Sequence, residues 1–257
     1  MDMQGRPVSP EAEQKVVQAF SVAMETMRRN GFDIGDGVQI AVDPTLSFMG
    51  YTKPQGRGFR ITISGNAIES GMLEGLILHE MCHIFRMRTH HPSHSASTLD
   101  AAVNSLGEQA LPYEYQQRVI SEILNNIEDL YADDIAVKLM RGGLVSEDQI
   151  IRFFQDWVKG EPEETDDPLR DGWINAGIMA NNARVIAQMV RHQIEDVGGR
   201  AGAVNEEFLS QVSPEISTQY EYFLNTLINL KEDIRQHEYR RLLDEYLTRF
   251  LQATETN

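Results

Sequence analysis

The chain has little of three things: cysteine, basic residues and long apolar runs. Its 257 residues include one cysteine, Cys82, so no intrachain disulfide can form. Lysine and arginine total 23 against 39 aspartates and glutamates, and the net charge of -16 disfavours binding to the phosphate backbone of nucleic acids. No apolar stretch approaches the ~20 residues that a membrane span needs, and residues 1–10 lack the basic and apolar regions of a signal peptide. We therefore expect a cytoplasmic protein without nucleic-acid or membrane partners.

The composition is otherwise that of an ordinary soluble globular protein, with 41% hydrophobic and 24% charged residues. Residues 10–29 have the apolar spacing of a helix, and Ser9 is its expected N-cap. Three short β-prone runs follow, at 38–42, 46–51 and 59–64. The turn-rich residues 53–58 are expected to form the hairpin loop between the last two runs. A half-buried pattern is expected for the last run, because its isoleucines alternate with polar residues.

From residue 71 onward the pattern predicts only helices. An apolar helix is expected near 71–88, and a long helix over 114–140 has apolar residues at helical spacing. Further helices are expected at 146–159, 172–196, 205–211, 214–233 and 237–252. We therefore predict an α+β, predominantly helical fold with a small N-terminal β-sheet. Its expected domains are a catalytic core over 1–141 and a helical region over 142–257, which packs on the core and offers a surface for oligomer formation.

The most informative motif is HExxH, in the first of these helices. His79 and His83 are one helical turn apart, so their imidazoles lie on one face and can hold one Zn²⁺. Glu80 lies beside them, where its carboxylate reaches a metal-bound water without binding the metal. Zinc lowers the pKa of such a water to about 7, and a nearby carboxylate can then take its proton. The spacing therefore predicts a zinc centre with Glu80 as general base.

The residues around the motif favour a metal over two surface histidines. The segment is apolar on both sides of the motif, from Ile68 to Met87. Burying an unpaired polar group in such a helix costs about 2 kcal/mol or more, and a metal is a partner that satisfies both histidines and the glutamate. Cys82 lies on a different helical face from the histidines, and we expect it to be a small buried residue without a chemical role.

A third protein ligand is needed, because a zinc enzyme usually supplies three and leaves the fourth position to water. The acidic segment 121–136 of the long helix is the best source. Glu128 shares a face with apolar side chains, which is an unusual place for a lone carboxylate. Asp129 lies on a more polar face, and Asp133 and Asp134 are expected to be solvated. We therefore predict Glu128 as the third ligand and keep Asp129 as the alternative.

With these residues the chain resembles the zincin metallopeptidases, and more specifically their glutamate-zincin branch. That branch has HExxH on one helix and an acidic third ligand on a later helix. Two registers of its downstream signature fit: Asn-x-x-Glu-Asp nominates Glu128, and Glu-x-x-Ala-Asp fits with Asp129 in place of the ligand glutamate. The resemblance covers residues 35–140. It implies a zincin-like core, in which a helix and a small sheet precede the motif helix, and a peptide or protein substrate.

Histidines after the motif are further alternatives for the third ligand. His90, His91 and His94 follow in a loop near the expected mouth of the site. The metzincin pattern HExxHxxGxxH would need a glycine at Arg86 and a histidine at Thr89, and the chain has neither. A likeness to peptide deformylases fails too, because those enzymes take a cysteine ligand from an upstream segment and the only cysteine here lies inside the motif.

These observations predict a zinc-dependent metallopeptidase that hydrolyses peptide bonds, with Glu80 acting on the zinc water. The alternative is a zincin-like metal-binding scaffold or interaction protein with little or no proteolytic activity. The intact Glu80 argues against that alternative, because a purely structural metal site has no need of this carboxylate. A helical domain without metal is the third possibility.

Two further expectations concern the substrate. The strand 59–64 is expected to pair with an extended substrate, a mode that supplies backbone hydrogen bonds without sequence choice. A second donor to the oxyanion is expected from the helical half of the chain, where His192 and His237 are candidates along with several tyrosines.

Overall fold

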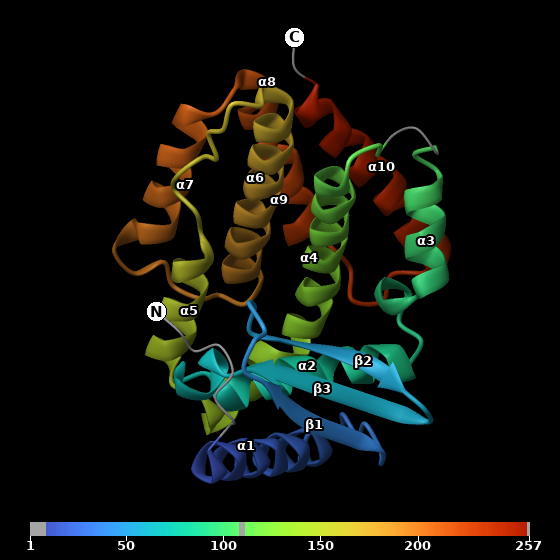
Figure 1. The fold of residues 1–257 in the computed structure, drawn as a ribbon, viewed down its shortest axis with the longest axis vertical. Coiled ribbons are helices and arrows are strands. Elements are labelled where there is room, and N and C mark those ends of the chain that lie inside the picture. The colour runs from blue at the N-terminus through green and yellow to red at the C-terminus, as the bar shows by residue number, and fades with distance from the viewer. Residues whose placement is uncertain (1–8, 108–110, 256–257) are drawn as a thin grey trace. The chain divides into compact units, whose positions relative to one another are not determined.

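The computed structural model describes residues 9–107 and 111–255. The fold is α+β and predominantly helical with a small sheet, as the sequence predicts (Figure 1). The chain forms two compact units: unit 1 takes the described part of Met1–His91 together with Ala132–Ile150, and unit 2 takes the described part of Pro92–Tyr131 and of Ile151–Asn257. The domains expected at 1–141 and 142–257 stay a prediction.

Unit 1 contains the sheet and the motif helix. Its elements, in chain order, are α1 (Pro10–Arg29), β1 (Val38–Asp43), β2 (Gly50–Gln55), β3 (Gly58–Ser64), the short 3₁₀ helix η1 (Asn66–Glu69), α2 (Leu73–Arg88), the end of α4 (Glu114–Leu139), the π turn η3 (Met140–Leu144) and the start of α5 (Glu147–Trp157). Helix α2 runs behind the sheet in Figure 1 and contacts β2 and β3. Helix α1 packs against α2.

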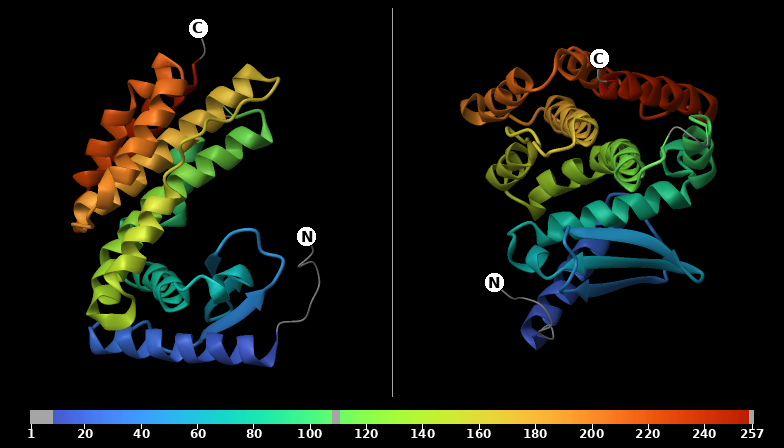
Figure 2. Two further views of the ribbon diagram at one scale, coloured as in Figure 1. Left: turned by 90° about the vertical axis from the view of Figure 1, so that its left-hand side faces the viewer. Right: turned by 45° about the horizontal axis from the view of Figure 1, so that its top comes forward.

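Unit 2 is helical in its described part. Its elements are the short 3₁₀ helix η2 (Pro92–His94), α3 (Ala96–Asn104), most of α4, most of α5, α6 (Pro168–Arg191), the 3₁₀ turn η4 (Val197–Gly199), α7 (Arg200–Gln211), α8 (Pro214–Ser217), α9 (Tyr220–Ile228) and α10 (Gln236–Thr254). Helix α6 contacts α9 and α10, and these three helices lie side by side in both views of Figure 2. Buried aromatic side chains such as Phe208, Phe223 and Phe250 fill the core between the helices of this unit.

The structure confirms most of the predicted helices. Helix α1 has the expected bounds, and the Ser9 hydroxyl caps it by accepting a hydrogen bond from the Ala12 N–H at 3.2 Å. Helix α4 ends one residue before the expected limit. One helix was expected over 214–233, whereas α8 and α9 occupy that segment, and α3 was not expected. No helix in the described part of the chain is both long enough and apolar enough to cross a membrane.

The sheet has the strand order β1-β3-β2, with β1 parallel and β2 antiparallel to β3. Strand β2 lies four residues later than expected, because residues 53–55 pair with β3 and do not form the loop. The pairs Lys53–Arg60 and Gln55–Gly58 extend the ladder to a short turn at 56–57. Pro54 is tolerated within β2 because this strand lies at the edge of the sheet.

Strand β3 lies in the centre of the sheet and pairs on both sides. The expectation that residues 59–64 add a substrate strand is therefore wrong, because β1 and β2 already use the backbone groups of β3. The expected half-buried pattern is wrong as well for the end of this strand. Ile61 and Ile63 are fully buried, and Thr62 and Ser64 are also buried.

The start of β3 depends on a close backbone approach. A Cβ atom on Gly58 would lie 2.0 Å from the carbonyl oxygen of Gly37, which also accepts a hydrogen bond from the Phe59 N–H at 3.1 Å. By contrast, a Cβ on Gly142 would meet no atom within 4 Å. The first glycine therefore has no room for a side chain, whereas the second does.

We expect Gly58→Ala to lower the free energy of unfolding by about 2 kcal/mol or more, because the backbone around Gly37 must move. Gly142→Ala is the matched control, and it should change stability by less than about 1 kcal/mol, in the stabilising direction. Urea unfolding followed by circular dichroism measures both values. Equal stability of the two variants would contradict the close approach.

Candidate metal centre

Helix α2 presents the HExxH motif from an apolar setting. It is buried on several sides, by Leu73, Ile77, Leu78, Met81 and Ile84 among others. Such burial fixes the rotation of the helix about its axis, since turning it would expose these side chains to water. The motif residues are therefore held in place by the packing of unit 1.

The two motif histidines face each other. Their Nε2 atoms lie 3.0 Å apart, and their rings meet edge to face with centroids 4.7 Å apart. Both side chains are half-buried. Zinc binds imidazole nitrogen at about 2.0–2.1 Å, so one ion can reach both Nε2 atoms from this arrangement.

Asp133 forms a hydrogen bond with the ring nitrogen of His79 that does not face His83. Its Oδ1 lies 2.7 Å from Nδ1 of His79, and the two side chains are 9% and 18% exposed, respectively. A carboxylate accepts hydrogen bonds, so the contact places the proton of a neutral ring on Nδ1 and leaves the Nε2 lone pair for a metal. The expectation that Asp133 is solvated is wrong, because the residue is buried against α2.

Asp129 completes a group of three ligand atoms. One side-chain atom each of His79, His83 and Asp129 lies within 4.8 Å of the other two. Asp129 is one turn before Asp133 on α4.

Glu128, the predicted third ligand, lies elsewhere on α4. It is not a member of this group in the part of the chain that the structure describes. Within unit 2 it lies near Tyr239 of α10: burial raises the pKa of that phenol well above its usual value, and the charge of Glu128 raises it further. The role of Glu128 as a ligand stays a prediction, which metal analysis tests below.

A buried arginine lies beside the candidate ligand. Arg184 of α6, with its side chain 6% exposed, has Nη1 at 4.0 Å from Oδ2 of Asp129. Its guanidinium also donates to the side chains of Gln188 at 3.0 Å and Asn181 at 3.2 Å. Nothing in the sequence pattern indicates this residue, because no motif links two positions that far apart in the chain.

Glu80 is buried and bound to the edge strand. The Thr52 hydroxyl donates to Oε2 of Glu80 at 2.7 Å, and the residue is 4% exposed. Oε1 lies on the side of Gly50, where a Cβ atom would be 3.6 Å away. The missing side chain at Gly50 therefore lets the backbone of β2 lie close to this oxygen. Thr52 is a second residue that the sequence analysis did not single out.

The remaining histidine candidates lie outside the group of three. His90 is exposed just after α2 with a positive φ of 54°, and no ligand group found in the described residues contains it, His91 or His94. In unit 2, His192 follows the end of α6 and His237 is exposed in the first turn of α10. Their role as oxyanion donors stays a prediction.

Cys82 is fully buried in the interior of unit 1. Its Sγ lies 3.9 Å from Sδ of Met27 in α1. Burial raises the pKa of the thiol well above its usual value, so the reactive thiolate is scarce at neutral pH. The burial agrees with the expectation of a packing residue.

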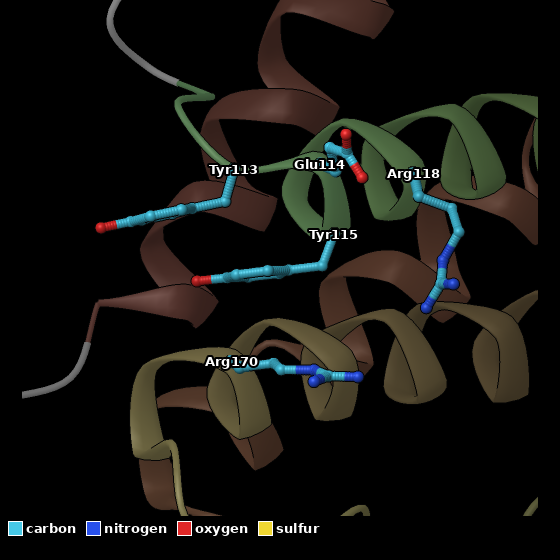
Figure 3. Close-up of a pocket in the computed structure, with 5 residues that line it drawn as sticks. All are labelled: Tyr113, Glu114, Tyr115, Arg118 and Arg170. Carbon is cyan, nitrogen blue, oxygen red and sulfur yellow. The ribbon is translucent and has the colours of Figure 1, made fainter.

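Unit 2 also contains a pocket of about 550 Å³. Figure 3 shows its lining residues, Tyr113, Glu114, Tyr115, Arg118 and Arg170. The rings of Tyr113 and Tyr115 are stacked, with centroids 5.5 Å apart and planes 7° from parallel. The pocket contains no residue of the motif or of the group of three, so it does not belong to the candidate centre.

The sequence of the chain matches a known protein family. A model described as a family of unknown function (DUF5781) matches residues 22–252. The chain belongs to this family. Within DUF5781 the matched range includes α2, α4 and every residue of the candidate centre. No curated protein and no solved structure matches the chain.

We expect the purified protein to bind about one zinc ion per chain. Asp129→Ala should lose this zinc, because only two nitrogen ligands remain, whereas the neighbouring Glu128→Ala should keep it. Elemental analysis after dialysis measures the content of each variant. Loss of zinc in Glu128→Ala alone would assign the ligand to the position that the sequence analysis favoured.

Asp133→Asn tests the support of the first histidine. The amide keeps the size of the side chain but loses its charge, and we expect zinc affinity to fall by about 10–100-fold. Asp134→Asn is the control, since it removes an adjacent carboxylate on another side of α4. Competition with a chromophoric chelator measures the dissociation constants. Equal affinities of the two variants would remove Asp133 from the centre.

Proposed function

We propose that the chain is a zinc-dependent metallopeptidase with a zincin-like centre. The observation that supports this most is the group of one ligand atom each from His79, His83 and Asp129, with Glu80 next to His79 in the sequence of the same helix. Two imidazoles and one carboxylate form a set of donors that catalytic zinc commonly uses. We place Asp129 in the set where the sequence analysis placed Glu128.

The donors fit a zinc ion in number and in chemical type. The Asp133 hydrogen bond holds the His79 proton on Nδ1, so its Nε2 is a lone-pair donor without prior proton loss. When bound, zinc activates a water molecule at neutral pH and polarises the carbonyl of the bond to be cleaved. This chemistry needs a base and an orientation for the substrate, which the chain's own residues supply.

Glu80 is the base. Thr52 occupies Oε2, so Oε1 is the oxygen that can accept a proton from the attacking water. The hydroxyl of Thr52 also holds the Glu80 carboxylate in one rotamer, so the base keeps its position. After the bond breaks, Glu80 can return the proton to the leaving amine.

Strand β2 is the element that orients the substrate. In the described part of the chain β2 pairs only with β3, which leaves its second edge open. An extended peptide can add to that edge through backbone hydrogen bonds. Since Thr52 of the same strand contacts Glu80, such a peptide would run beside the base. We therefore move the substrate strand from 59–64 to the edge of β2.

Glu80→Gln tests the base directly. We expect this variant to keep its zinc and to lose at least about 100-fold in the rate of hydrolysis of an unfolded, fluorescently labelled protein. Zinc content and rate are measured on the same preparation. Unchanged hydrolysis would reject Glu80 as base, and zinc without hydrolysis in the wild type would favour the metal-binding scaffold.

Thr52→Val tests whether the Thr52 hydroxyl keeps the Glu80 carboxylate in position. The substitution keeps the shape but removes the donor, and we expect kcat/KM to fall about tenfold. Thr45→Val is a matched control, because the Thr45 hydroxyl also donates to a carboxylate, that of Asp43 at 2.7 Å, away from the motif. A similar loss in both variants would mean that the effect comes from the general stability of the sheet.

A further inference from the structure

Basic residues collect on one hairpin of this acidic chain. The net charge is -16, yet residues 44–68 contain no aspartate or glutamate. The same segment has three cationic side chains, Lys53, Arg57 and Arg60. It includes all of β2 and β3, so the charge reversal coincides with the sheet edge beside Glu80.

The hairpin brings these cations together without acidic partners. Lys53 on β2 is the direct register partner of Arg60 on β3, and Arg57 is exposed in the turn between them. Like charges directly opposite each other destabilise a strand pair. In the described part of the chain none of the three forms an ion pair; Lys53 instead has its Nζ 5.6 Å from the centre of the Tyr51 ring.

These side chains lie on the outer face of the sheet. Thr52 points towards Glu80 of α2, and side chains alternate along a strand, so Tyr51 and Lys53 point to the opposite face. Phe48 extends this surface: its ring centroid lies 5.9 Å from that of Tyr51, and it is 54% exposed. The free edge of β2 therefore carries aromatic and cationic groups on the face away from the base.

We propose that Lys53, Arg57 and Arg60 select acidic residues in an extended peptide that pairs with the free edge of β2. The inference rests on the proposed function, because it names the substrate class of the same site. A peptide on that edge would direct alternate side chains to the outer face. Glutamate or aspartate there would meet two or three cations that form no ion pair in the described part of the chain, whereas lysine would be repelled.

A peptide fits this surface better than a nucleic acid does. The three cations are confined to one hairpin, and the chain as a whole has a net charge of -16, which repels a long polyanion. A strand edge, by contrast, offers backbone donors and acceptors that match those of a peptide. A nucleic acid is kept as an outcome of the experiment.

The test compares labelled peptides of about twelve residues that differ only in charge. Glutamates at alternate positions are replaced by glutamines in one peptide and by lysines in another. Fluorescence anisotropy measures binding to zinc-loaded, full-length Glu80→Gln, and cleavage is followed with the wild type. At about 0.05 M salt we expect the glutamate peptide to bind about tenfold more tightly than the glutamine peptide, with the difference falling below about twofold at 1 M salt.

Two triple variants separate local from overall charge. Lys53→Gln/Arg57→Gln/Arg60→Gln should abolish the preference for glutamate. Lys15→Gln/Arg28→Gln/Arg29→Gln on α1 changes the net charge by the same amount at exposed positions and should keep the preference. Circular dichroism spectra that match the parent protein establish that both variants are folded.

The outcomes distinguish this inference from the proposed function. Equal binding of the glutamate and glutamine peptides, or an equal loss of preference in both triple variants, would overturn the inference even if all peptides are cleaved. Charge-selective binding without any cleavage by the wild type would support it and reject the peptidase. Tighter binding of a single-stranded oligonucleotide than of the glutamate peptide, lost in the hairpin variant, would also overturn it.

Discussion

The hydrogen bond between His79 and Asp133 is the interaction on which the candidate centre depends. It joins α2 to α4 through two side chains that are largely shielded from water, where an unpaired carboxylate would be costly. The same contact orients the ring so that Nε2 points towards His83. One hydrogen bond thus sets the tautomer and the ring orientation of His79.

The small sheet has a role in this arrangement beyond completing the core of unit 1. Its central strand β3 is buried and provides a rigid support, while the antiparallel edge strand β2 carries the groups that face outward. Thr52 connects this strand to the buried carboxylate of Glu80. The proposed base and the proposed peptide-binding edge are therefore linked by a single side chain, and a shift of β2 along β3 would disturb both.

The sequence predicted the elements whose signals are local. Helix α1 has a cap, a proline in its first turn and an apolar stripe, and its bounds were right. The motif helix and α4 were predicted from their apolar residues, and each ends within one residue of the expected limit. Strand β2 was misplaced because residues 53–55 look like a loop until their pairing with β3 is known. Such pairing joins different segments of the chain, so local propensity does not report it.

The choice between the two candidates for the third ligand shows the same limit of local sequence signals. Glu128 and Asp129 are adjacent, and the apolar face of α4 correctly marks the side that packs into the protein; it does not say which helix that side meets. Glu128 lies near Tyr239 of α10, whereas Asp129 shares its face with Asp133 and lies near Arg184. A buried guanidinium at 4.0 Å provides the counter-charge that Asp129 needs without a metal. With zinc bound as proposed, Arg184 would draw charge from the carboxylate and leave the ion a stronger Lewis acid, so the residue least visible in the sequence would tune the reactivity of the centre.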